Sequence, residues 1–268
     1  SFNSESIRRV NSIRNIVNIL LSNDDSAFAE GIQVLYQALS TKHNVTVIAP
    51  DRNCSGASNA LSLHQPLRLT QLENGFYSVN GTPSDCVQLG VNTHQFAQPD
   101  IVISGINHGP NLGDDVIYSG TVAAATEGRH LGFPALAVSM DGHKNWQFET
   151  AGKVLLALLD KLSSLPLNDH QILNINVPNI AYDELKGWAI TRLGSRHKAE
   201  NMVKTQDPFG RDIFWYGRLG PEQDAGEGTD FYALNQRQVS ITPISIDMTD
   251  HQGLKTLTQW LDATQPTT

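Results

Sequence analysis

Short apolar runs alternate with amphipathic stretches along the first two thirds of this chain. The apolar runs are typical of buried strands, which we predict at 17–21, 45–49, 101–104, 135–139 and 172–177. The stretches between them predict helices at 27–40, 82–92, 119–131 and 148–162, the second of which is opened by Pro83 at its first position. In the first helix, for example, Ile32, Leu35 and Leu39 share one face with Tyr36. This alternation favours an α/β fold with a mostly parallel, doubly wound sheet and helices on both faces.

Two segments depart from the alternation. Residues 67–72 and 76–79 flank the turn sequence Glu73-Asn74-Gly75 and predict a β-hairpin. After Pro178, strands are predicted at 188–193, 213–216 and 238–246, with a polar stretch at 194–211 and a short amphipathic helix at 254–261. A two-stranded arm and a terminal helix bury little apolar surface within one subunit, and we therefore expect them to contact a second subunit.

Two adjacent carboxylates, Asp24 and Asp25, follow the first predicted strand. They lie where the strand leaves the sheet, and in open α/β sheets ligands bind at the carboxyl ends of the strands. Neighbouring carboxylates repel each other and raise each other's proton affinity unless a cation compensates for their charge. The simpler alternative is a turn aspartate beside a helix N-cap.

Two further oxygen donors, Ser55 and Asn107, are expected at the same edge, because each follows another predicted strand. Carboxylate, hydroxyl and amide oxygens together suit a hard cation such as Mg²⁺, Mn²⁺ or Ca²⁺ rather than zinc. Taken singly, each of the two is also compatible with an ordinary turn residue.

The sequence Tyr118-Ser119-Gly120-Thr121 stands where a helix is predicted to begin. Free backbone N–H groups and the helix dipole make such a start a natural anion site, although a plain N-cap is the alternative. The hydroxyls of Ser119 and Thr121 can donate hydrogen bonds, and Gly120 lets an anion approach the backbone. A cation site that faces an anion site across one crevice indicates hydrolysis of phosphate esters, in which one carboxylate holds the metal and the other accepts a proton.

Composition and missing motifs narrow the function further. The formal net charge of −8 argues against binding a nucleic-acid polymer, which usually needs a basic surface. The two cysteines, Cys54 and Cys86, form no CxxC pair and fit a reduced, cytoplasmic protein. No apolar run approaches the roughly 18 residues of a membrane span, so no membrane contact is expected. The absence of GxxxxGK(S/T) and GxSxG excludes P-loop enzymes and α/β-hydrolases, and the absence of GxGxxG after a strand leaves nicotinamide dehydrogenases little support.

Seven short motifs occur in a fixed order along the chain. They are SNDD at 22–25, APDRN at 49–53, SGAS at 55–58, GTPSDCV at 81–87, SGIN at 104–107, GPNLGDDV at 109–116 and YSGTVAAA at 118–125. These motifs resemble those of the survival protein SurE family, and the resemblance extends from about residue 17 to residue 262.

The resemblance implies a metal-dependent nucleotidase that hydrolyses nucleoside 5′- and 3′-monophosphates and also acts as an exopolyphosphatase. It implies one divalent ion per subunit, Mn²⁺ or Mg²⁺, with ligands at Asp24, Asp25, Ser55 and Asn107. The phosphate-contacting residues of the family fall on Asn111, Ser119, Gly120 and Thr121. Of the two aspartates, Asp25 is our choice for the proton acceptor, although the sequence does not separate it from Asp24.

The resemblance also divides the chain into three parts. A Rossmann-like catalytic part is expected at 17–180, and a part with the β-hairpin arm and terminal helix at 181–268 is expected to exchange elements in a homodimer or homotetramer. Residues 1–16 form an N-terminal extension, which is either native or a cloning remnant.

One loop departs from the family pattern. Residues 26–30 are Ser-Ala-Phe-Ala-Glu, where the family usually begins with glycine, so a backbone with positive φ at Ser26 would be strained. The first alternative to an enzyme is therefore a nucleotide-binding protein whose turnover is weakened or lost through this loop. The second is an oligomeric scaffold that does not need its aspartates. Phe28, Tyr118 and Trp146 are candidates for contacting the base.

Overall fold

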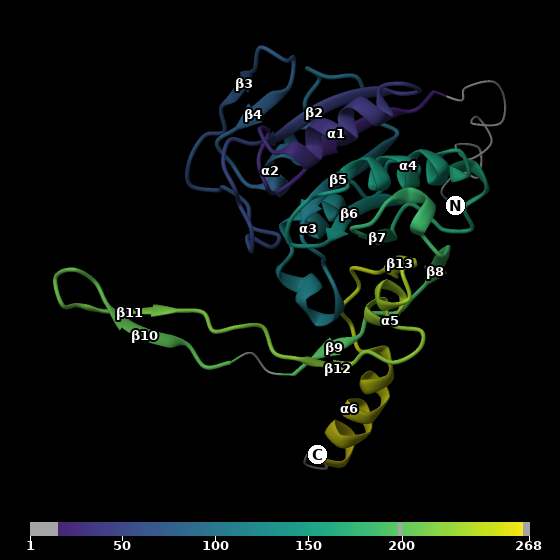
Figure 1. Cartoon of the computed structure of the whole chain (residues 1–268). Coiled ribbons are helices and arrows are strands. Elements are labelled where there is room, and N and C mark those ends of the chain that lie inside the picture. The colour runs from purple at the N-terminus through teal and green to yellow at the C-terminus, as the bar shows by residue number, and fades with distance from the viewer. Residues whose placement is uncertain (1–15, 198–199, 265–268) are drawn as a thin grey trace.

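The computed structural model describes residues 16–197 and 200–264, and within them nine strands form one central sheet (Figure 1). The strand order is β3 (Leu69–Gln71), β4 (Tyr77–Val79), β2 (Asn44–Pro50), β1 (Asn18–Ser22), β5 (Ile101–His108), β6 (Ala135–Asp141), β7 (Ile172–Pro178), β13 (Val239–Ile244) and β8 (Trp188–Ile190). From β4 to β7 every neighbouring pair is parallel. The predicted α/β fold with a mostly parallel sheet is confirmed.

Helices cover both faces of this sheet (Figure 1). Helices α1 (Glu30–Leu39) and α4 (Phe148–Leu159) pack together on one face, and α2 (Pro83–Asn92) and α3 (Gly120–Glu127) pack together on the other. Side chains alternate along each strand, so in β1 Leu21 belongs to the core beneath α1 and α4, whereas Leu20 belongs to the core beneath α2 and α3. Both faces are therefore apolar, and polar groups gather at the strand ends.

Several element boundaries differ from those predicted. Helix α1 begins at Glu30 and not at residue 27, because Ser26 has φ +105 and the N–H of Ala27 donates to the Pro50 carbonyl at 2.9 Å. Helix α3 ends at Glu127 and not near residue 131, because Gly128 ends it against β5, where a Cβ would lie 2.2 Å from Val102. Strand β5 is longer than predicted and continues to His108, and the predicted 148–162 helix ends at Leu159.

Short 3₁₀ turns add to these differences. They lie at η2 (Gly113–Tyr118), η3 (Leu162–Ser164) and η4 (Tyr182–Glu184), and η2 occupies a segment that the sequence analysis treats as a loop. The predicted hairpin is confirmed, because β3 and β4 pair in antiparallel fashion on either side of Asn74 and Gly75. No helix in the described part of the chain is long and apolar enough to cross a membrane.

The pairing of the C-terminal strands differs from the arm that the sequence predicts. Strand β8 does not pair with 213–216 but joins the main sheet beside β13, which pairs with β7. The arm consists of β10 (Val203–Gln206) and β11 (Asp212–Trp215), and β10 falls in the stretch predicted to be only polar. Two more short strands, β9 (Ser195–Arg196) and β12 (Glu222–Asp224), join the base of the arm.

The arm and the last helix project from the body of the molecule (Figure 1). Helix α5 (Asp230–Asn235) packs near β13, whereas α6 (His251–Thr264) extends away from the sheet. The predicted N-terminal extension at 1–16 lies outside the described residues except for its last residue.

Candidate functional site

The predicted site residues converge on one edge of the sheet. Strand β1 lies between β2 and β5, so the order of strands along the chain reverses at β1. At such a reversal the connections leave the carboxyl ends of adjacent strands on opposite faces and leave a crevice between them. Asp24 and Asp25 follow β1, Ser55 lies in the loop after β2, and Asn107 lies at the end of β5.

Asp24 is the buried member of the carboxylate pair, with 4% of its surface exposed. The Thr121 hydroxyl donates to Asp24 Oδ1 at 2.5 Å, and the Cys54 N–H donates to the Asp24 carbonyl at 2.7 Å. Burial raises the pKa of the Asp24 carboxyl to about 6; the Thr121 hydrogen bond opposes this rise, and the charge of Asp25 adds to it. A nearby cation would therefore stabilise the ionised form of this buried carboxylate.

Asp25 is held by the two neighbouring strand ends. Its Oδ2 accepts from the His108 N–H at 3.0 Å and lies 2.9 Å from His108 Nδ1. Its Oδ1 accepts from Asn53 Nδ2 at 3.3 Å. The imidazole of His108 is fixed in turn by edge-on contacts with Phe148 and Trp146, whose ring centroids lie 4.8 and 5.3 Å away.

Ser55 and Asn107 lie on the same two loops that reach Asp25. The Ser55 N–H donates to Asn53 Oδ1 at 2.9 Å, so Asn53 links Ser55 to Asp25. Asn107 Nδ2 donates to the Gly109 carbonyl at 2.8 Å, which leaves Asn107 Oδ1 as the acceptor end of the amide. Two carboxylates, a hydroxyl and an amide oxygen on adjoining loops form a donor set that fits a hard divalent cation.

The start of α3 lies directly against Asp24. A Cβ at Gly120 would come within 2.8 Å of the Asp24 carboxylate, so only glycine fits there. The Ser119 hydroxyl accepts from the Val122 N–H at 3.1 Å as an N-cap, and the fully buried Thr121 hydroxyl is used by Asp24. The backbone N–H of Thr121 also interacts with the Asp24 carboxylate, so the N–H of Gly120 in the first turn is the group left to meet an anion.

Asn111 is fixed by side chains that the sequence analysis did not single out. Its N–H donates to Asn176 Oδ1 at 2.8 Å, its Nδ2 donates to Ser139 Oγ at 2.7 Å, and its carbonyl accepts from Asn174 and Asn176. Ser139 is also the partner of Asn107 in the pairing of β5 with β6. The two asparagines of β7 are polar residues two positions apart in an apolar strand, and that pattern could have identified them.

Asp230 and His108 were missed for a different reason. Asp230 is fully buried, and its carboxylate accepts from the N–H groups of Gly113 at 2.7 Å and Gly194 at 2.9 Å, so it anchors η2 from a segment far along the chain. His108 meets Asp25 only after β1 and β5 have paired. No local sequence pattern reports contacts of this kind.

The loop that departs from the family pattern has the strained conformation suggested for it. Ser26 has φ +105, in the region that favours glycine, and its carbonyl accepts from Asn23 Nδ2 at 2.9 Å. The candidate aromatic side chains differ in position: Phe28 and Tyr118 are exposed, whereas Trp146 is partly buried against Phe148.

Comparison with known proteins identifies the relatives of this chain. The family model described as survival protein SurE matches residues 19–200. Proteins named 5′-nucleotidase SurE from Pseudoalteromonas atlantica, Methylococcus capsulatus and Idiomarina loihiensis are 58%, 56% and 55% identical to this chain. These matches cover 91–92% of the chain and 98–99% of each relative.

A solved structure is similar over the same extent. The crystal structure of the SurE protein from Aquifex aeolicus superposes with a TM-score of 0.80 at 41% identity, covering 91% of this chain and 99% of that one. Both the sequence and the arrangement of the strands are therefore shared. The chain belongs to the survival protein SurE family.

Proposed function

We propose that this chain is a metal-dependent phosphatase that converts nucleoside 5′-monophosphates to nucleoside and phosphate. The observation that carries the proposal is the contact between the start of α3 and the carboxylate pair, made by the Thr121 hydroxyl and Asp24 Oδ1 at 2.5 Å. This contact puts a helix start suited to a phosphate beside carboxylates suited to a cation. The name 5′-nucleotidase, carried by relatives that are 55–58% identical, supports the same activity.

One divalent ion per subunit, Mg²⁺ or Mn²⁺, would be held by Asp24, Asp25, Ser55 and Asn107. The raised pKa of Asp24 and the all-oxygen donor set fit such an ion. When bound, the ion supplies positive charge that offsets the charge of a phosphoryl group and acidifies water.

The phosphate would be held by the side chain of Asn111 and by the start of α3. The backbone N–H of Gly120 and the positive end of the helix dipole would attract the phosphate, with Thr121 beside them. Ser119 fixes this start as its N-cap, with the Val122 N–H donating to the Ser119 hydroxyl. Asn111 is held in place by Ser139 and Asn176, and its role would be to orient the phosphate.

Asp25 is the proposed proton acceptor. Its side chain is 9% exposed, while Asp24 is more deeply buried and is engaged by Thr121. His108 and Asn53 orient the Asp25 carboxylate through contacts of 2.9 and 3.3 Å. A carboxylate fixed in this way can take a proton from water that attacks phosphorus.

The experiment measures phosphate release from nucleoside 5′- and 3′-monophosphates and from short polyphosphate, with Mn²⁺ or Mg²⁺ and again with EDTA. We expect release from 5′-monophosphates that needs metal, and activity on 3′-monophosphates and polyphosphate forms the wider part of the proposal. If nucleotide is retained in equilibrium dialysis but no phosphate is released, the chain is a nucleotide-binding protein. The positive φ of Ser26 is the observation that favours this alternative. A chain that neither binds nor hydrolyses nucleotide would favour a scaffold.

The proposal extends to a homodimer or homotetramer. The arm exposes Phe209, Trp215 and Tyr216, which are 83%, 64% and 91% exposed, and α6 exposes Leu257 at 63%. Exposed aromatic and aliphatic side chains on two projecting elements favour contact with further subunits.

In the same proposal, residues 17–180 carry the catalytic site, residues 181–268 serve oligomerisation, and residues 1–16 are an extension. The unpaired thiols of Cys54 and Cys86 favour a cytoplasmic location.

A further inference from the structure

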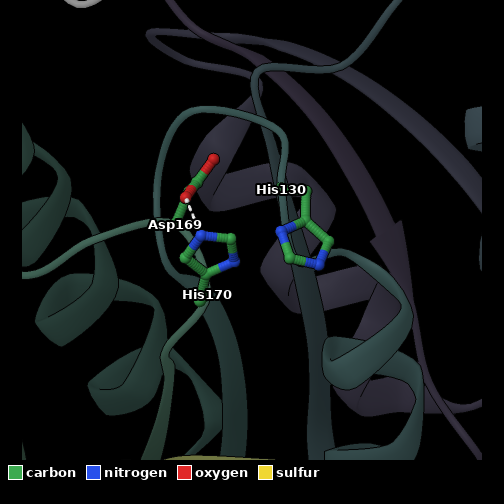
Figure 2. Close-up of side chains that lie close together, drawn as sticks. All are labelled: His130, Asp169 and His170. Atoms are coloured by element: carbon green, nitrogen blue, oxygen red, sulfur yellow. Dashed lines mark ion pairs between the residues drawn. The ribbon is translucent and has the colours of Figure 1, made fainter. Parts of the chain in front are cut away.

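A second group of metal-ligating side chains lies at the opposite end of the sheet from the aspartates. His130 stands in the connection between α3 and β6, and Asp169 and His170 stand in the turn before β7 (Figure 2). Because β6 and β7 are parallel neighbours, these two connections meet at the amino ends of the strands. Asp24 and Asp25, by contrast, follow the carboxyl end of β1.

The three side chains are close enough to share an ion. One ligand atom from each lies within 4.8 Å of the other two. His170 Nε2 lies 3.7 Å from Asp169 Oδ1, and the rings of His130 and His170 have centroids 4.4 Å apart. An ion with ligand bonds of about 2.1 Å needs these ligand atoms to lie about 3 to 4 Å from one another. Small side-chain rotations can bring them from their present separations to that spacing.

The backbone already joins the two connections. The N–H of His130 donates to the carbonyl of Asp169 at 2.9 Å. The loops are thus held together before any ion binds, so binding has to order only the side chains. His130 and His170 are exposed, which leaves room both for side-chain rotation and for water to complete the coordination.

The neighbouring cation does not oppose an ion at this position. Arg129 precedes His130, but its guanidinium donates to the Thr126 carbonyl at 2.7 Å and lies 4.0 Å from the Glu127 carboxylate. The charge of Arg129 is therefore offset on α3, and the carboxylate of Asp169 supplies negative charge to the cluster.

We propose that His130, Asp169 and His170 form a second metal site, which takes a divalent transition-metal ion such as Zn²⁺ or Ni²⁺. Two imidazole nitrogens and one carboxylate favour Zn²⁺, Ni²⁺, Co²⁺ or Cu²⁺ over Mg²⁺. The oxygen donors beside β1 have the opposite preference, so the two sites select different ions. An ion at the second site fastens the connection before β6 to the turn before β7 and stabilises the folded chain by mass action.

The test is a calorimetric titration of the full chain with Ni²⁺ in excess Mg²⁺, which competes for the oxygen donors beside β1. We expect wild-type protein to bind one equivalent. Each of His130→Asn and His170→Gln should weaken binding at least about tenfold, because even the hydrogen-bond partners of metal ligands are commonly worth that much. Asparagine is chosen at position 130 because His130 has φ +73, which asparagine tolerates.

His251→Gln is the matched control. His251 is the first residue of α6, and its Nε2 lies 2.7 Å from Oδ2 of Asp247 in the segment before the helix. It is therefore an exposed histidine with a carboxylate partner, outside the cluster of His130, Asp169 and His170. This variant should bind Ni²⁺ as the wild type does, and electron paramagnetic resonance of bound Cu²⁺ should show one nitrogen ligand fewer only in the position 130 and 170 variants. Nickel binding that both of those variants retain, or wild-type protein that binds no nickel, overturns the proposal.

Discussion

The two aspartates that follow β1 are neighbours in sequence but have different surroundings. Asp24 is buried and accepts from the Thr121 hydroxyl, whereas Asp25 accepts from Asn53 and from the His108 backbone. Burial disfavours the ionised form of Asp24, whereas the hydrogen bonds of Asp25 fix the orientation of its carboxylate. This asymmetry is why we assign proton acceptance to Asp25 and expect pH to act on the metal-free fold through Asp24.

The first prediction concerns the metal-free protein and Asp24, whose pKa burial raises from 3.8 to about 6. Well below pH 3.8 both the folded and the unfolded chain hold this proton, so the group contributes nothing. As pH rises from 3.8 to 6 the unfolded chain releases the proton while the folded chain keeps it, so the free energy of unfolding falls by about 3 kcal/mol, and this fall is complete above pH 6. Asp24→Asn should remove this loss.

Urea unfolding in EDTA at intervals from pH 4 to pH 7 measures the effect. The stability of Asp24→Asn relative to wild type should increase across this range by about 2 kcal/mol, because the unfolded carboxyl is already partly ionised at pH 4. A difference between the two proteins that stays constant with pH would contradict the assignment.

The second prediction concerns His108, which we interpret as a positioning residue for Asp25. His108→Ala keeps the backbone N–H bond but loses the contact at Nδ1, so kcat should fall about tenfold, as for other residues that orient metal ligands. His108→Asn restores a donor near Nδ1 and should recover most of the rate. The exposed His94→Ala serves as the control, and an unchanged kcat in His108→Ala would rule the role out.

At the scale of elements, the connection from β1 to α1 determines how the aspartates are presented. The helix starts only at Glu30, and the N–H of Ala27 bonds to the end of β2, so the residues between form a turn around Ser26. Close packing reinforces this path, because a Cβ at Gly31 would lie 2.2 Å from the Ile106 carbonyl oxygen. The backbone of this turn therefore has little freedom to relax.

The third prediction is that Ser26→Gly stabilises the protein by about 1 kcal/mol, because glycine adopts φ +105 without strain. We expect kcat to stay unchanged, which would mean that the departure at Ser26 does not affect turnover. Ser40→Gly at the other end of α1, where φ is −65, is the control and should stabilise nothing. A large rise in kcat for Ser26→Gly would instead mean that this loop had weakened turnover.

The strands in the middle of the sheet and the four helices that cover it could be predicted from the sequence, because the buried strands are apolar runs and the helices have apolar faces or a start signal such as Pro83. The boundaries at Glu30 and Gly128 could not, because contacts with β2 and β5 decide them. The sequence order of strand ends predicted that the aspartates, Ser55 and Asn107 would share one edge. The supports from His108, Asn176 and Asp230 depend on distant pairings, which no local pattern contains.

At the scale of the whole molecule, the site is assembled within one body while the arm and α6 extend outward (Figure 1). Leu254 and Leu257 are 51% and 63% exposed and lie three residues apart, on one side of α6. The exposed aromatic side chains of the arm belong to a second projecting element, which extends in a different direction from α6 (Figure 1). Because the arm and α6 are separate, each can contact a different neighbouring subunit.

The fourth prediction is that the purified chain is a dimer or tetramer and that Leu257→Glu shifts it towards smaller species. The new carboxylate would have to be buried in the subunit contact, which is unfavourable. Thr256→Glu adds the same charge one position earlier on α6 and should leave the assembly unchanged. Light scattering after size-exclusion chromatography measures both, and a wild-type monomer would contradict the proposed oligomer.

The most direct test of the central claim is the rate of phosphate release from a nucleoside 5′-monophosphate with Mn²⁺, compared between Asp25→Asn and Asp51→Asn. Asp51 follows β2 at the same edge but pairs with Arg52 at 2.8 Å and serves as the matched control. We predict that Asp25→Asn loses at least about a hundredfold in kcat, because the proton acceptor is gone, while Asp51→Asn keeps its activity. Release by Asp25→Asn at the wild-type rate would contradict the account.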